Sequence, residues 1–188
     1  REVLECGREV MNILNGIGRV LHDNWQNAEV VAVQSIGADG RRCHYLLPEP
    51  IVGRSHASLR AVVVRADGTV DDSPPVDPFA ETHSVAAAHL NVRRALALFG
   101  AGQGWFDLYK VLELIEEDVG GMHTLLEMKW ANAAAIKNFK HTANSASALG
   151  DAASRHTKQK DAPPKNPISL EEARKLIRSL MISWIGSK

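Results

Sequence analysis

The residues best suited to chemistry in this sequence are concentrated between positions 137 and 160. This tract holds five Lys or Arg and two His, with Asp151 as its single acidic residue: Lys137, Lys140, His141, Arg155, His156, Lys158 and Lys160. Arg offers a planar fork of donors that fits phosphate oxygens, and His exchanges a proton near neutral pH. The tract predicts a site for an anionic ligand, with a solvated basic loop as the alternative.

The overall charge balance conceals this basic end. The 188 residues carry 22 Lys and Arg against 22 Asp and Glu, but residues 131–188 hold ten of the basic and only four of the acidic side chains. Clustered cations raise the local positive potential whatever the total charge is. Either the C-terminal part meets an anionic partner, or the acidic and basic parts complement each other within the fold.

The helices predicted on either side of the tract must hold it in place. Apolar residues recur at three- and four-residue spacing over 9–21, 85–99, 105–119, 124–139 and 170–184, and Ser169 with Glu172 forms the capping-box pattern of a helix start. Residues 141–168 are a 28-residue connection between the last two helices, and loops of that length are typically functional or disordered.

The first part of the chain has a different residue pattern. Runs rich in β-branched residues at 30–36, 43–47 and 59–64 predict strands, and the proline-rich stretch 71–78 predicts a linker. We therefore expect an α+β protein. Residues 1–78 would form a small β-rich region with one helix and about three antiparallel strands, and residues 79–188 an antiparallel bundle of about four helices.

Several classes of function lack a signature in this sequence. The glycine clusters near Gly16 and Gly102 do not have phosphate-loop spacing, and no GxSxG nucleophile motif occurs. The histidines, Cys6 and Cys43 show no metal-ligand spacing, so we expect neither a metal nor a cofactor. Without an apolar leader or a long apolar run, we expect a cytoplasmic protein with no membrane contact.

The helix that begins Trp105-Phe106-Asp107, the segment from Phe139 to Asn144 and the pair Arg155-His156 together resemble a known family. Residues 100–188 resemble the HEPN-like helical domain of largely uncharacterised bacterial proteins. HEPN domains are all-α modules of prokaryotic defence and toxin systems. The resemblance implies a homodimer that binds RNA and cleaves it without a metal. The family motif places His four to six residues after Arg, whereas Arg155 and His156 are adjacent, so whether the protein is an enzyme stays open.

The resemblance also implies roles for individual residues. Arg155 would hold a phosphate, His156 would act as acid or base toward a ribose hydroxyl, Asn144 would orient one of them, and Glu113 would be the polar residue of the early helix. The binding residues would be Lys137, Lys140, His141, Lys158 and Lys160. The alternative is a non-enzymatic module that docks another polypeptide, and a weaker third option is a hydrolase of a small phosphorylated molecule.

Overall fold

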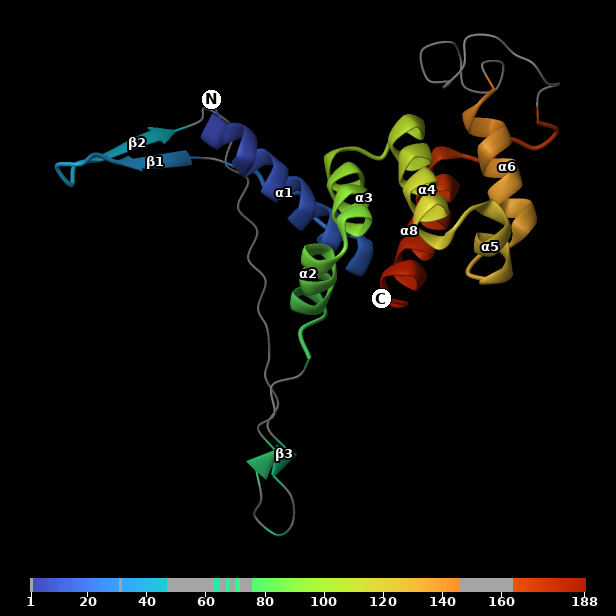
Figure 1. Cartoon of the computed structure of the whole chain (residues 1–188), viewed down its shortest axis with the longest axis horizontal. Coiled ribbons are helices and arrows are strands. Elements are labelled where there is room, and N and C mark those ends of the chain that lie inside the picture. The colour runs from blue at the N-terminus through green and yellow to red at the C-terminus, as the bar shows by residue number, and fades with distance from the viewer. Residues whose placement is uncertain are drawn as a thin grey trace. The chain divides into compact units, whose positions relative to one another are not determined.

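The computed structural model describes residues 2–30, 32–46, 63–64, 67, 70–71, 76–145 and 164–188. These residues form two compact units: residues 1–29 together with 78–188, and residues 30–77. The described chain is mostly helical (Figure 1). None of its described helices is long and apolar enough to cross a membrane.

Seven helices are described, more than the four expected for the bundle together with the one expected before it. They are α1 (Glu2–Leu21), α2 (Pro78–Ala88), α3 (Leu90–Ala101), α4 (Trp105–Val119), α5 (Met122–Glu127), α6 (Ala133–Ala143) and α8 (Leu170–Ile185). The two additional helices arise because predicted helices are interrupted. His89 has an extended backbone between α2 and α3, and Lys129 has a φ of +55° between α5 and α6. Neither break carries a Gly or Pro that would signal it in the sequence.

The unit formed by residues 30–77 contains two separate hairpins. Strand β1 (Ala32–Ile36) pairs antiparallel with β2 (Arg42–Leu46), and β3 (Val63–Val64) pairs antiparallel with β4 (Val70–Asp71). The expected β-rich region of about three antiparallel strands is therefore not supported. The described strands join only in pairs, and those of the second hairpin are two residues long, too short for the sheet that the β-branched runs suggested.

Helix α1 belongs to the helical unit, which corrects the expected boundary that placed it in a region 1–78. Its packing against α3 depends on Gly16 and Gly100. A Cβ at Gly16 would lie 2.1 Å from the carbonyl oxygen of Leu96, and one at Gly100 would lie 1.8 Å from that of Asn12. Gly16 and Gly100 thus let the backbones of α1 and α3 touch.

The loop that follows α1 is tied to it by a buried amide. The Oδ1 atom of Asn15 accepts hydrogen bonds from Trp25 Nε1 at 3.0 Å and from the backbone N–H of Ala28 at 2.7 Å, and its Nδ2 donates to the Ala28 carbonyl at 2.9 Å. The Trp25 ring lies against Gly18, where a Cβ would be 2.1 Å from it. Both polar ends of the Asn15 amide are therefore satisfied.

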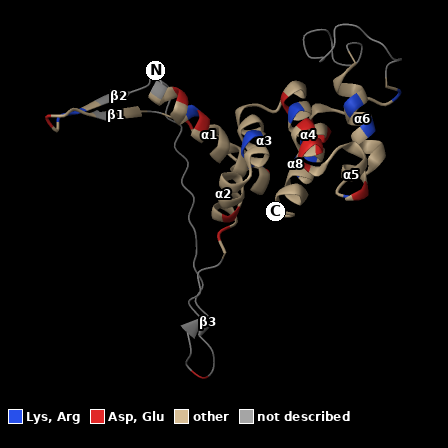
Figure 2. Ribbon diagram, viewed as in Figure 1, with Lys and Arg blue, Asp and Glu red and all other residues tan. Residues whose placement is uncertain are grey.

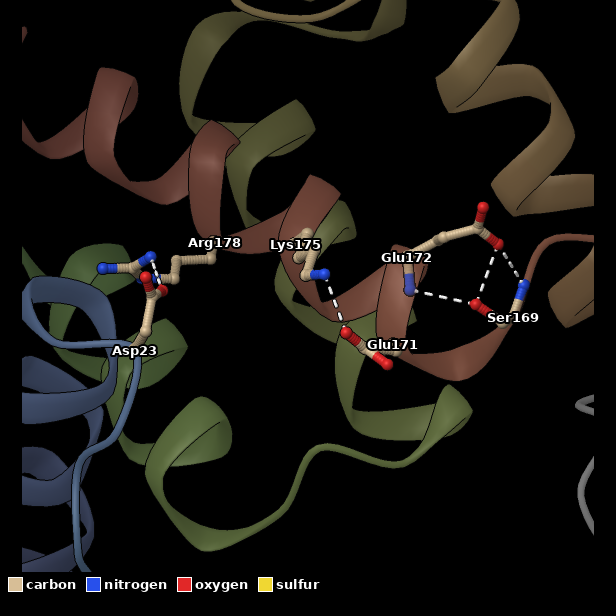
Figure 3. Close-up of polar contacts among 6 residues, drawn as sticks. All are labelled: Asp23, Ser169, Glu171, Glu172, Lys175 and Arg178. Carbon is tan, nitrogen blue, oxygen red and sulfur yellow. Dashed lines mark hydrogen bonds and ion pairs between the residues drawn. The ribbon is translucent and has the colours of Figure 1, made fainter.

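Helix α8 begins at the predicted capping box and lies against α4. The Ser169 hydroxyl accepts a hydrogen bond from the Glu172 N–H, and the Glu172 carboxylate accepts one from the Ser169 N–H at 2.7 Å (Figure 3). At the other end, Trp184 Nε1 donates to Asp118 of α4 at 2.8 Å. The helical core consists of fully buried side chains from six of the helices, including Ile17, Leu96, Phe99, Leu108, Leu112, Ile115, Leu125, Phe139, Ile177, Leu180 and Trp184.

Candidate functional site

Polar side chains line the seam between α4 and α6. On α4, Tyr109, Glu113 and Glu116 follow one face at spacings of four and three residues, and on α6, Lys140 and Asn144 are four residues apart. Asn144 contacts Tyr109, and Lys140 contacts Glu116, so the two helices run antiparallel along the seam. The fold thus gathers Glu113, Lys140 and Asn144, three of the predicted site residues, along one helix pair.

Lys140 is held within this seam. Its ammonium donates to the two carboxylate oxygens of Glu116 at 2.9 and 3.1 Å, and it lies 5.7 Å from the centre of the Tyr109 ring. The side chain of Lys140 is 29% exposed and that of Glu116 only 17%. A carboxylate this close neutralises the ammonium locally, so Lys140 stabilises the helix pair.

Asn144 ends α6 beside the Tyr109 hydroxyl. Its Nδ2 donates to that hydroxyl at 3.4 Å, while its buried Oδ1 accepts no hydrogen bond from any described group. Tyr109 is itself fixed by stacking on Phe139, with ring centres 6.0 Å apart. A buried acceptor without a donor costs free energy, and such groups mark positions that a ligand or a further donor satisfies.

The remaining described candidates differ in exposure. Lys137 is exposed on α6, whereas His141, on the last turn of the same helix, is half-buried. Glu113 is half-buried on α4, between the two contacts of the seam. Of the basic residues predicted to bind ligand, Lys137 is therefore the one that the described structure leaves at the surface. Arg155, His156, Lys158 and Lys160 lie outside the described residues.

Two hydrogen bonds from α6 hold the chain where it returns from residues 146–163. Thr142 Oγ1 accepts from the backbone N–H of Ile168 at 3.3 Å, and Asn138 Nδ2 donates to the Asn166 carbonyl at 2.9 Å. Thr142 is fully buried, and Ser145, where α6 gives way to this interval, is only 3% exposed. Residues on both sides of the interval are thus anchored on α6.

Sequence reasoning missed these anchors and the partner of Lys140. In the sequence, Tyr109 belongs to the apolar face of its helix, and Glu116 is one of several surface carboxylates. Only the α4–α6 contact distinguishes Glu116 from Glu113 and Glu117. Asn138 and Thr142 lie four residues apart, which places them on one face of α6, and that spacing was the available signal.

The described residues also bear on metal chemistry. No group of three or more His, Cys, Asp or Glu side chains within them is arranged to hold a metal ion.

Comparison with protein-family models, curated proteins and solved structures finds no match to this chain.

Proposed function

We propose that this protein is a HEPN-like helical protein that binds RNA, or another polyanion, through the basic tract of residues 137–160. The observation that carries the proposal is the anchoring of the tract. It leaves the C-terminal end of α6, and the chain returns to hydrogen bonds with Asn138 and Thr142 on the same helix. Both described flanks of the tract are thus held on one helix, and a polyanion site needs several cations along one bound phosphate backbone.

The charge of α6 supports the proposal. The helix contains Lys137, Lys140 and His141 but no acidic residue. In Figure 2, α6 accordingly has blue segments and no red one. Because Glu116 neutralises Lys140, we assign ligand contact to Lys137 and to the basic residues that follow Asn144. The unmatched Oδ1 of Asn144 lies within the tract, at the end of α6, and would accept a hydrogen bond from a bound ribose hydroxyl or from Arg155.

Binding and cleavage need separate tests. Fluorescence anisotropy with a labelled single-stranded RNA measures affinity, and gel analysis of the same RNA in the presence of EDTA measures metal-independent cleavage. Arg155→Ala and His156→Ala should each weaken binding or abolish cleavage, and Arg94→Ala, which removes an exposed cation from α3, is the matched control. Unchanged affinity and cleavage in both tract variants would refute the proposal.

A second candidate function is a protein-interaction module, and the first half of α1 favours it. Val3 is 68% and Val10 47% exposed, at a spacing of seven residues that places them on one helix face. Exposed apolar faces on helices commonly mark contact surfaces. Light scattering of the wild type and of Val3→Asp/Val10→Asp would reveal a homodimer that uses this face. A monomeric wild type would exclude self-association through it.

A further inference from the structure

Two arginines from distant parts of the sequence meet at the link between α3 and α4. Arg19, on α1, donates through Nη1 to the Phe99 carbonyl at 2.7 Å, and Arg174, on α8, donates through Nε to the Gln103 carbonyl at 3.2 Å. Both side chains are half-buried, so each still reaches solvent. The fold thereby places two guanidinium groups on one short backbone segment.

The cations next to this pair on α8 are already balanced. Arg178 forms an ion pair with Asp23 and also donates through Nε to the Val20 carbonyl at 2.9 Å, and Lys175 pairs with Glu171 at 2.7 Å. Figure 3 shows these two ion pairs along the helix. The carboxylates Asp23 and Glu171 are therefore occupied by Arg178 and Lys175.

Within the described part of the chain, Arg19 and Arg174 form no ion pair of this kind, although the charge of Arg174 helps to lower the pKa of Glu171. Among the described residues, each guanidinium has one hydrogen bond, to a neutral carbonyl, and no ion pair with a carboxylate. Burial lowers the pKa of Arg19, and the neighbouring charge of Arg174 lowers it further. Because arginine stays protonated, the fold holds two like charges near each other at an electrostatic cost.

The backbone beside the pair is rich in glycine, and its Gly104 N–H donates to the Asp107 carboxylate at 3.2 Å. The link between α3 and α4 consists of Gly102, Gln103 and Gly104. A hydrogen bond to one carbonyl uses only one of the roughly five N–H donors of a guanidinium group. Most donors of Arg19 and of Arg174 are therefore available to a ligand. An oxyanion would both use these donors and offset the repulsion.

We propose that Arg19 and Arg174 form a binding site for a phosphate oxyanion, either free or as the terminal group of a small phosphorylated ligand. The site is separate from the basic tract of α6, and its ligand is recognised by two guanidinium forks. The charges of Arg19 on α1 and Arg174 on α8 are then balanced by the bound anion. The site predicts one phosphate per chain, in preference to chloride.

Isothermal titration with inorganic phosphate and, separately, with phenyl phosphate tests this site, in chloride buffers of matched ionic strength. We expect saturable binding with one site per chain. Arg174→Gln retains a donor for the Gln103 carbonyl but loses the charge, and should weaken binding about tenfold. Arg94→Gln removes an exposed α3 cation without touching the site and should stay within about twofold of the wild type.

A second variant and a direct spectroscopic measurement distinguish loss of the site from misfolding of Arg174→Gln. Arg19→Lys keeps the charge and a donor for the Phe99 carbonyl but loses the planar fork, so we expect about fivefold weaker binding. In the wild type, phosphate should shift the Nε–H resonances of Arg19 and Arg174 and leave that of Arg94 in place. Absence of saturable binding, or equal affinity in wild type, Arg174→Gln and Arg94→Gln, would overturn the proposal. Binding of phenyl phosphate more tightly than phosphate would identify the phosphorylated ligand as the better fit.

Discussion

The ammonium of Lys140 bridges both carboxylate oxygens of Glu116, at 2.9 and 3.1 Å, across the seam between α4 and α6. This contact separates two residues that look equivalent in the sequence. Lys137 is exposed, while Lys140 is bound to a carboxylate that is itself 17% exposed. The two lysines should therefore respond differently to substitution.

Lys140→Met should destabilise the protein by about 1–3 kcal/mol, because it leaves the Glu116 carboxylate without its counter-charge. Urea denaturation measures this loss. Adding Glu116→Gln should recover part of it, since the unpaired charge is then gone. Lys137→Met is the matched control and should change stability by less than about 0.5 kcal/mol. Equal stability of the two lysine variants would contradict the assignment.

Replacing either glycine of the α1–α3 contact should separate the two helices. Gly16→Ala and Gly100→Ala place a methyl group 2.1 and 1.8 Å from backbone oxygens, which cannot move away as a flexible side chain could. We expect each to cost more than about 2 kcal/mol of unfolding free energy. Gly104→Ala is the control, since its nearest contact would be an ordinary 3.5 Å, and its stability should stay near that of the wild type.

Asp118 should make the junction of α4 and α8 sensitive to acid. Burial alone would raise the pKa of its carboxyl, but hydrogen bonds from Lys188 and Trp184 outweigh that effect, and the pKa lies below its ordinary value of 3.8. A depressed pKa contributes stability that is present above the unfolded-state pKa and is lost as the pH falls through the folded-state pKa.

Asp118→Asn should therefore lower stability by about 1–2 kcal/mol at pH 7, and the difference from wild type should shrink as the pH falls below about 4. Denaturant titrations followed by tryptophan fluorescence at several pH values measure both effects. A difference that stays constant down to acid pH would show that the ionised carboxylate contributes nothing. Glu127→Gln, at an exposed position of α5, provides the control.

Thr142 should hold the segment that follows the basic tract. Thr142→Val keeps the shape of this fully buried side chain but removes the acceptor for the Ile168 N–H. We expect a loss of about 1–3 kcal/mol and faster hydrogen exchange at Ile168. Ser84→Ala, which removes an exposed hydroxyl bonded to Ala80, should have a much smaller effect. Unchanged exchange at Ile168 would mean that the threonine does not anchor this segment.

Local patterns predicted the elements whose signals are contained within a few residues. The helix over 105–119 and the capping box of Ser169 and Glu172 are confirmed because periodicity and a cap are local properties. The breaks at His89 and Lys129 were missed because neither residue type forces a break. The role of Gly16 was missed because it depends on Gly100, 84 positions away in the sequence.

The candidate site was predictable to a similar extent. Residue type identified the lysines, and the HEPN-like resemblance suggested Asn144 and Glu113. The structure places Glu113, Lys140 and Asn144 along one seam. Residue type alone could not separate Lys140 from Lys137, because the difference arises from Glu116 on another helix. The hydrogen bonds of Asn138 and Thr142 to the returning chain likewise require the fold.

The salt dependence of RNA affinity tests the central claim most directly. Binding of a labelled single-stranded RNA should weaken steeply as the salt concentration rises, and the slope of log affinity against log salt should fall by about 0.7 for each phosphate contact removed in Lys137→Ala and Arg155→Ala. Arg94→Ala should keep the wild-type slope. A wild-type affinity that does not change with salt, or slopes that are identical in all four proteins, would contradict the proposed role of the basic tract.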